Sequence, residues 1–296
     1  MLKNNAVVIA GNGPSLKEID YSRLPNDFDV FRCNQFYFED KYYLGENIQA
    51  AFFFPGNFFE QYYTLNTLMQ KKEYKCKNIV CKLFPLQHET HQKSLKKFKQ
   101  IFPIFFPFAI DGNEAYLSRL KELNALLNFH FLYKNGMQPT TGIYAIACAI
   151  ACGYKDIYIT GIDFYSSSNY AYDISSKTGL LSLNPSFKAE YLKSHSKDID
   201  LEILYFLKKT YSINFFSISP NSPLVEYIQL APNQNGQFFP KDKPIDTIKD
   251  ILIPSKEAYK RYYRALYLEN NTFINFIYDF LKFPSAIKKY LKYRNK

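Results

Sequence analysis

The sequence predicts an α/β fold built on a mostly parallel sheet. Short apolar runs bounded by turn residues are typical of buried strands, and they occur at residues 7–10, 29–32, 50–54, 78–81, 157–160 and 213–218. The chain between them is long enough for helices or crossover loops, and strands that alternate with helices form layers around a parallel sheet. Because ligands of such folds gather beyond the carboxyl ends of the strands, the loops at those ends are candidate site loops.

The first strand leads into a glycine-rich turn, Gly11-Asn12-Gly13-Pro14-Ser15. A helix is expected to begin directly after it, at residues 16–19. The turn departs from a dinucleotide-binding fingerprint, because Leu16 stands where the third glycine of that motif belongs, so NAD binding has little support. The backbone N–H groups of the turn, with Asn12 and Ser15, can hold a nucleotide, and a purely structural turn explains the same residues.

The strongest helix pattern covers residues 143–151, with Gly153 as its C-terminal stop. Thr140 and Thr141 precede this helix, where their hydroxyl oxygens can cap it. The same helix terminus offers unpaired N–H groups to an anion. Capping alone is sufficient to account for both threonines.

Phenol groups follow the next strand. Asp163 and Tyr165 lie just beyond its end, and Tyr170 comes shortly after them. Phenol hydroxyls in this position can stabilise a departing phosphate without a metal ion. Because the chain contains 26 tyrosines, packing is the alternative role for each of them.

Residues 166–194 are predicted to form a mobile lid, since they are rich in Ser, Asn, Tyr and Lys and lack clear periodicity. Long loops of this kind inside a compact domain are commonly active-site lids. A helix at residues 198–209 then resumes the core. His195 borders the lid, and among the four histidines it is the best candidate for a general base.

The other histidines do not suggest a site. His130 lies between two phenylalanines, so we expect it in the core. His88 and His91 lack the cysteine or carboxylate partners that a zinc site needs, so no bound metal is expected. A serine hydrolase has no support, because the sequence contains no G-x-S-x-G turn.

Composition narrows the setting of the protein. The sequence has no run of eighteen or more uncharged apolar residues and no signal peptide pattern. We therefore expect a cytoplasmic protein that neither spans a membrane nor is secreted. The five cysteines are scattered and odd in number, which favours reduced structural thiols.

The net charge of +10 is compatible with nucleic-acid binding, but its distribution argues against that function. After Asp279, basic residues alternate with apolar ones and no acidic residue follows. This pattern predicts contact between the C-terminal tail and an anionic membrane surface. A solvated, partly frayed tail is the alternative.

Three stretches closely resemble the bacterial glycosyltransferase family 42, whose members are sialyltransferases acting on lipooligosaccharide: IAGNGPSLKEID at 9–20, FRCNQFYFEDKYY at 31–43 and GIDFY at 161–165. The similarity continues through His195-Ser196-Lys197 and through residues 219–222 and 250–255. It implies one Rossmann-like, GT-A-type nucleotide-binding domain, made of residues 1–165 and 195–262, with the lid 166–194 inserted and a basic amphipathic tail at 263–296. A homotetramer, held peripherally at the inner membrane by the tail, is also expected.

The resemblance implies a role for each site residue. His195 would take the proton of the acceptor hydroxyl, and Tyr165 and Tyr170 would hydrogen-bond the leaving phosphate. No metal or other cofactor is expected. The pocket for the donor, CMP-N-acetylneuraminic acid, would be lined by Gly11, Asn12, Gly13, Ser15, Asn34, Gln35, Gln61, Gln138, Thr140, Thr141, Gly161 and Asp163.

The expected reaction is inverting transfer of the sialic acid to a terminal galactose of lipooligosaccharide, with α-2,3 linkage. This chain departs from the family pattern at Gln138, where an arginine is typical, at Phe54, where a small polar residue is typical, and at Leu192, where a tyrosine is typical. Two alternatives therefore stay open. One is a transferase for another CMP-activated keto sugar, and the other is a non-catalytic, membrane-associated protein that binds CMP-sugars.

Overall fold

The computed structural model describes residues 4–84, 99, 102–134, 137–164, 170–173, 195–244, 248 and 272–294. The chain forms two compact units, Met1–Ile253 and Pro254–Lys296. The first unit contains the sheet and all of the described residues that were predicted for the site. The second contains one long helix, α9 (Thr272–Arg294).

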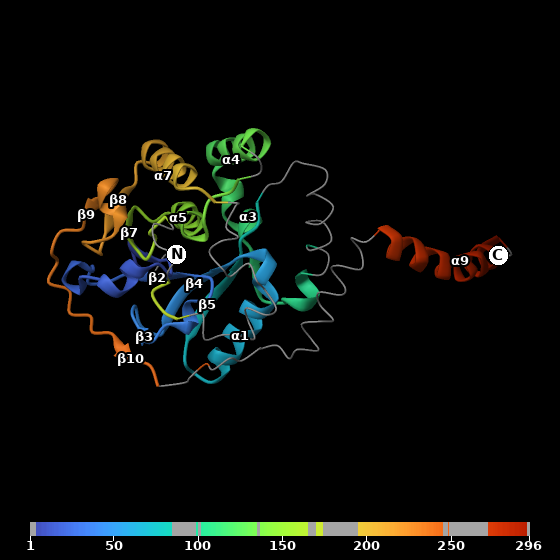
Figure 1. The fold of residues 1–296 in the computed structure, drawn as a ribbon, viewed down its shortest axis with the longest axis horizontal. Coiled ribbons are helices and arrows are strands. Elements are labelled where there is room, and N and C mark those ends of the chain that lie inside the picture. Colours follow the sequence, from blue (N-terminus) through green and yellow to red (C-terminus); the bar gives the residue numbers. More distant parts are fainter. Residues whose placement is uncertain are drawn as a thin grey trace. The chain divides into compact units, whose positions relative to one another are not determined.

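The first unit is built on an eight-stranded sheet in which all the pairings between neighbours are parallel, so the predicted α/β fold is confirmed (Figure 1). The strand order is β6-β5-β4-β2-β1-β7-β8-β9. The bounds are β1 Ala6–Ala10, β2 Asp29–Cys33, β4 Asn47–Phe53, β5 Lys75–Cys81, β6 Ala109–Asp111, β7 Asp156–Thr160, β8 Asn214–Ser217 and β9 Gln229–Leu230. Strand β1 pairs with β2 on one side and with β7 on the other, so the order reverses there and the crevice beyond β1 is the expected ligand position.

Helices cover both faces of the sheet because its strands are apolar on both sides. Val7 and Ile9 of β1 pack in one core cluster with α4 (Lys121–Tyr133), α5 (Thr141–Cys152) and α7 (Lys197–Tyr211). Val8 points to the other face and packs in a second cluster with Leu16. On that second face, α1 (Phe58–Gln70) places Phe58 against Phe53 of β4, with ring centroids 6.2 Å apart.

The predicted helix before β7 is confirmed as α5, and its caps follow the sequence signals. The Thr140 hydroxyl accepts a hydrogen bond from the N–H of Ile143, and Gly153 ends the helix in the left-handed conformation with φ of 99°. The helix is buried along almost its whole length, because its residues are small and apolar. Its N-terminus therefore points at the carboxyl edge of the sheet from a fixed position.

The segment after the glycine-rich turn differs from the expected helix, since it is a 3-10 helix, η1 (Pro14–Glu18). The Leu16 N–H donates to the Gly13 carbonyl three residues back over 3.0 Å, and the Ser15 N–H, which would have no partner within a helix, donates to the Asp163 carboxylate. The remaining short 3-10 and helical turns are η2 Tyr21–Arg23, η3 Phe36–Phe38, η4 Pro55–Asn57, α3 Gly112–Ala115, η5 Leu117–Arg119 and η8 Pro223–Glu226. A separate antiparallel pair joins β3 (Lys41–Tyr42) to β10 (Lys241–Asp242).

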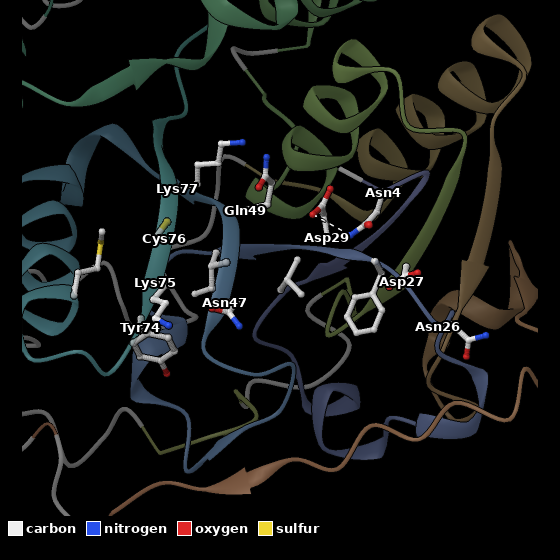
Figure 2. A pocket seen from close by; sticks show the side chains of 14 residues that line it. Asn4, Asn26, Asp27, Asp29, Asn47, Gln49, Tyr74, Lys75, Cys76 and Lys77 are labelled. Atoms are coloured by element: carbon white, nitrogen blue, oxygen red, sulfur yellow. Dashed lines mark hydrogen bonds between the residues drawn. The ribbon is translucent and has the colours of Figure 1, made fainter. Parts of the chain in front are cut away.

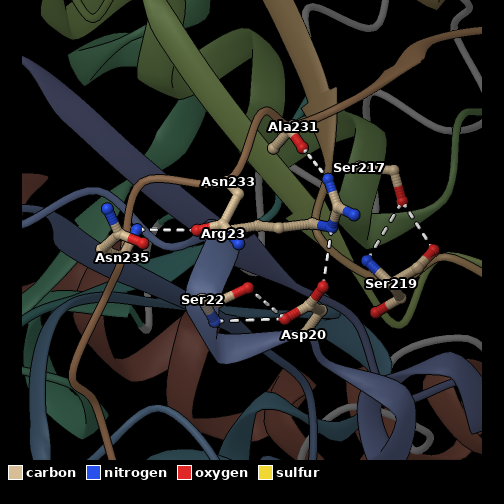
Figure 3. Close-up of polar contacts among 8 residues, drawn as sticks. All are labelled: Asp20, Ser22, Arg23, Ser217, Ser219, Ala231, Asn233 and Asn235. Carbon is tan, nitrogen blue, oxygen red and sulfur yellow. Dashed lines mark hydrogen bonds and ion pairs between the residues drawn. The ribbon is translucent and has the colours of Figure 1, made fainter.

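Polar contacts fix the connection that follows β9 (Figure 3). Arg23 of η2 donates to Asp20 over 2.8 Å and also to the Ala231 carbonyl. In the same region the Ser217 hydroxyl donates to the Ser219 carbonyl over 3.0 Å. The Arg23 contacts hold the connection after β9, and the Ser217 contact holds the turn after β8, whose Ser219 hydroxyl donates to the Ser15 carbonyl of the glycine-rich turn over 2.7 Å.

The predictions for isolated residues can be compared with the structure. His130 is buried in α4, with its Nε2 3.0 Å from a carboxylate oxygen of Glu202, so its predicted core position is confirmed. All five cysteines are free thiols and four of them are buried. His88 and His91 lie outside the described residues, as does most of the predicted lid.

In the second unit, α9 carries many exposed apolar side chains and contains Pro284. Within the described part of the chain, no helix combines the length and the apolarity that crossing a bilayer requires. The exposed apolar residues of α9 are Phe273, Phe276, Ile277, Phe280, Leu281, Phe283, Ile287, Tyr290 and Leu291.

Candidate active site

The carboxyl ends of β1 and β7 meet so closely that the residues after them, Gly11 and Gly161, must both be glycine. The Gly11 N–H donates to the Thr160 carbonyl and the Gly13 N–H to the Gly161 carbonyl, each over 2.9 Å. A Cβ atom at Gly11 would lie 2.1 Å from the Gly161 oxygen, and Gly161 itself has φ of +64°. The glycines thus let two strand ends touch, which brings the loops after β1 and β7 into one crevice.

Ser15 and Asp163 hold the glycine-rich turn in place. One Asp163 oxygen accepts from the Ser15 N–H over 2.9 Å, and the other accepts from the hydroxyls of Ser15 and Ser222. The Ser15 hydroxyl oxygen in turn accepts from the Gly161 N–H over 3.0 Å. Both of these predicted substrate-binding side chains therefore have partners within the turn, and their polar atoms position its backbone.

Asn12 and Asn34 leave polar atoms unpaired beside the turn. Asn12 donates its amide to the Cys33 carbonyl over 2.8 Å, and Asn34 lies 3.4 Å from the Thr141 hydroxyl. Among the described residues the side-chain oxygens of both have no hydrogen-bond partner although they are buried. Asn34 also adopts a positive φ of 50°, a conformation that asparagine tolerates better than most residues. The loop after β2 is thus shaped to present this side chain.

Gln61 is completely buried, with 0% of its surface exposed. In the described part of the chain, neither its amide nitrogen nor its oxygen has a partner. Leaving such groups unpaired costs about 1–3 kcal/mol each, so a bound ligand that satisfied them would gain affinity. The preceding residue, Glu60, accepts from the Tyr37 hydroxyl, and burial raises the pKa of its carboxyl to about 8.

Residues 170–173, which belong to the predicted lid, lie against both strand-end loops. The Ala171 N–H donates to the Asn12 carbonyl and the Tyr172 hydroxyl to the Gln35 carbonyl, each over 2.8 Å. Tyr170 stacks on Tyr172, and burial raises the pKa of its phenol, so it keeps its proton at neutral pH. Tyr165 lies outside the described residues.

His195 is held at the start of α7, beside the N-terminus of α5. Its Nδ1 lies 2.9 Å from the Gln138 carbonyl oxygen, which can only accept a hydrogen bond. The proton is therefore on Nδ1, and Nε2 carries the lone pair. Burial, assisted by the charge of Lys82, lowers the pKa of His195 to about 4. The imidazole is thus neutral at physiological pH and can accept a proton.

Two residues that sequence reasoning missed support this arrangement. Lys82 follows β5 and donates from its ammonium group to the Pro139 carbonyl over 2.6 Å. Asp200, in the first turn of α7, accepts from the Thr140 N–H over 2.8 Å. The sequence did contain a signal for Lys82, because a charged residue directly after an apolar strand is a candidate for a site. It contained no such signal for Asp200.

A hollow of about 720 Å³ lies at the opposite edge of the sheet (Figure 2). It is lined from the amino ends of β2, β4 and β5 by residues that include Asp29, Asn47 and Lys75. None of the predicted site residues borders it. The site residues that the structure describes gather instead at the carboxyl ends of the strands. In those described residues we find no group of three or more His, Cys, Asp or Glu side chains arranged to hold a metal ion.

Comparisons with known proteins extend this geometry. The family model for alpha-2,3-sialyltransferase (CST-I) matches residues 5–294. The sialyltransferase CstII from Campylobacter jejuni, solved in complex with the substrate analogue CMP-3FNeuAc, is 50% identical, and the match covers 88% of this chain and 98% of that chain with a TM-score of 0.78. A structure of CST-II in complex with a trisaccharide acceptor and CMP is also 50% identical, with coverage of 88% and 99% and a TM-score of 0.77. The monofunctional alpha-2,3-sialyltransferase Cst-I from Campylobacter jejuni is 41% identical, with coverage of 91% and 96% and a TM-score of 0.82.

Proposed function

Because the chain belongs to the CST-I alpha-2,3-sialyltransferase family and is a sialyltransferase, we propose that it transfers N-acetylneuraminic acid from CMP-N-acetylneuraminic acid to a terminal galactose of lipooligosaccharide, forming an α-2,3 linkage. One observation carries the proposal: Asn12 and Asn34, beyond the ends of β1 and β2, and Gln61, in the first turn of α1, have buried unpaired polar atoms, and a neutral histidine is held beside the N-terminus of α5. The CMP complexes of CstII support the same donor class.

In the proposed reaction, the galactose hydroxyl oxygen attacks the anomeric carbon of the sialic acid. The bond from that carbon to the phosphate oxygen of CMP breaks, and its electron pair stays on that oxygen. The configuration inverts because the hydroxyl attacks the face opposite the departing CMP. Nε2 of His195 takes the hydroxyl proton, which contributes about 10²–10⁴-fold to the rate. The phenols of Tyr165 and Tyr170 donate hydrogen bonds to the departing phosphate, and the reaction needs no metal ion.

The remaining predicted residues bind the donor. Asn12, Asn34, Gln35 and Gln61 hydrogen-bond its sugar and base, and Thr140 and Thr141 present the α5 N-terminus to its phosphate. Gly11, Gly13, Ser15, Gly161 and Asp163 shape the turn that receives the nucleotide, and Gln138 orients His195. We further propose that residues 166–194 close as a lid over the donor and that the enzyme works as a homotetramer, on the strength of the family resemblance.

A donor panel tests this function. With CMP-N-acetylneuraminic acid, a fluorescent lactoside and EDTA, we expect a sialylated product that an α-2,3-specific sialidase removes. Loss of turnover in EDTA, with recovery when divalent metal is added, would contradict metal independence. Transfer from a different CMP-keto sugar would retain the reaction class but replace the proposed donor. Binding of the donor without transfer to any galactoside would refute the reaction.

We propose that the tail attaches the enzyme peripherally to the anionic cytoplasmic face of the inner membrane. The exposed apolar side chains of α9, among them Phe276 and Phe280, support this, because apolar side chains enter the interface while lysines meet lipid head groups. Lipooligosaccharide is itself anchored in a membrane, so attachment would bring the acceptor to the site.

Removing the tail after Tyr263 is expected to abolish co-sedimentation with vesicles that contain phosphatidylglycerol, while turnover on a soluble lactoside stays within about twofold. The reason is that vesicle binding depends on apolar insertion plus lysine charge. A full-length variant with Phe276→Ser and Phe280→Ser retains every charge and should lose most of the binding. If both forms sediment like the wild type, the tail is not the membrane contact.

A further inference from the structure

The side chain of Lys82 is almost completely buried from solvent. It follows β5 directly, at the carboxyl edge of the sheet, and only 1% of its surface is exposed. Lysine is almost never buried to this degree unless its ammonium group has partners. The Lys82 ammonium has one at 2.6 Å, the carbonyl oxygen of Pro139, and it also lies 5.4 Å from the centroid of the Phe84 ring.

The partner carbonyl belongs to the segment that positions the proposed base. Pro139 is next to Gln138, whose own carbonyl accepts from Nδ1 of His195. On the other side, Thr140 caps α5 and gives its N–H to Asp200. Consecutive backbone groups are thus held from two parts of the chain: by Lys82, which follows β5, and by His195 and Asp200, which both lie at the start of α7.

We propose that Lys82 is a positioning residue for His195, and that its ammonium group both holds the Gln138–Pro139 segment in place and supplies the fixed positive charge beside the imidazole. This inference rests on the proposed function, in which His195 is the general base. In this role Lys82 supplies a positive charge to a region where residue 138 is a neutral glutamine.

The charges around Lys82 support this role. Asp200 of α7 favours the ammonium form through its negative charge, and burial opposes that form, so the pKa of Lys82 is lowered to about 8. The Cys33 thiol at the end of β2 also faces Lys82, but burial raises its pKa to about 12 and it stays neutral. The pKa of Asp200 is raised to about 6 by burial, so at neutral pH it is mainly a carboxylate opposite a lysine that is mainly charged.

The sign of the effect on His195 follows from these charges. A positive group nearby disfavours the imidazolium form, so it extends the neutral, proton-accepting form to lower pH. When Lys82 loses its charge, the pKa of His195 should rise and its ring should lose the fixed position that the Pro139 anchor provides.

Histidine titration by NMR tests the proposal without any turnover. In the wild type, with the ring signal assigned by comparison with His195→Ala, we expect the imidazole to titrate below about pH 5. In Lys82→Met the titration should move up by about half a unit or more. Lys82→Arg, which keeps the charge, should stay close to the wild type. Lys77→Met is the matched control, because Lys77 lies exposed near the start of β5, the strand that Lys82 follows.

Steady-state kinetics supply the second measurement. In Lys82→Met we expect kcat to fall by about tenfold or more and the acid limb of the pH profile to move with the NMR titration, while the KM of the donor changes less. Lys77→Met should match the wild type in both. A purely structural lysine would lower the melting temperature and leave the titration of His195 unchanged, and that result would overturn the proposal.

The wild-type titration alone is also decisive. A pKa of His195 near or above 6.5 in the wild type would overturn the proposal even if Lys82→Met failed to fold. If the wild type transferred no sugar from any donor, the proposed function would fail, but the coupling between Lys82 and His195 would still be measured. The two failures are therefore distinguishable.

Discussion

Replacing His195 with alanine is expected to lower kcat for sialyl transfer by about 10²–10⁴-fold, which is the usual contribution of a general base. The imidazole is the neutral proton acceptor beside the α5 N-terminus, and Asn12, Asn34 and Gln61, which are proposed to hold the donor, keep their positions without it. CMP affinity, measured by calorimetry, should therefore change less than about threefold. A fall in kcat with unchanged CMP binding separates loss of the base from loss of the site.

The pH dependence of the wild type should agree with this role. A base with a pKa of about 4 in the free enzyme is lost as the pH falls through that value, so kcat/KM should decline only below about pH 5. His130 provides the control, since it is buried on α4 with its Nε2 close to the carboxylate of Glu202 on α7. His130→Gln should lower thermal stability and leave the rate of the folded enzyme unchanged. Wild-type turnover in His195→Ala would remove the proposed mechanism.

Gly161→Ala is expected to destabilise the enzyme by about 3 kcal/mol or more, because two costs combine. The left-handed conformation at φ of +64° costs an L-residue about 1–2 kcal/mol. The added Cβ would also lie 2.6 Å from the backbone oxygen of Gly11, and forced overpacking costs about 1–3 kcal/mol. The melting temperature should drop by roughly 6–12 °C, at about 2–4 °C for each kcal/mol.

Gly45→Ala is the matched control, because Gly45 also has a positive φ, of +80°. A Cβ atom there would meet only the Phe238 ring, at an ordinary 3.7 Å. Its melting temperature should therefore drop by roughly 2–8 °C, the cost of backbone strain alone. Calorimetric scans of both variants give the difference, which is the cost of the contact between the ends of β1 and β7. Equal drops would show that this contact is not tight.

The elements that sequence reasoning predicted well are those whose signals are local. The run 7–10 gave β1 because five consecutive residues are buried on both faces, and the Ala-rich pattern after Thr141 gave α5 with its two caps. Strand β5 was predicted too short, because Lys75 and Lys77 conceal the pairing of its first half with β4, whereas β8 was predicted slightly too long. The expected α-helix after Pro14 is a 3-10 turn, in which the Leu16 N–H bonds to the Gly13 carbonyl, and the turn is held by a carboxylate 148 residues away that accepts from the Ser15 N–H.

The candidate site shows the same division. Motif resemblance identified Asn12, Asn34 and His195 from short stretches of sequence, and the structure brings the first two to neighbouring strand ends. Motif resemblance could not assign the contacts that support these residues, because Asp163 accepts hydrogen bonds from Ser15 and Ser222, which are distant from it in the sequence. Whether a polar side chain is available to a ligand depends on such partners.

Periodicity, turn residues and motif spacing were thus enough to identify a parallel α/β fold with its nucleotide-binding turn, since each depends on neighbours within one strand or helix. The burial of Lys82, its hydrogen bond to Pro139 and its charge beside His195 follow only from the tertiary structure, which brings the residue after β5 to the segment before α5 and the start of α7. Burial and electrostatic coupling are properties of residues distant in the chain and close in space, and they set which histidine tautomer and which charges the site presents.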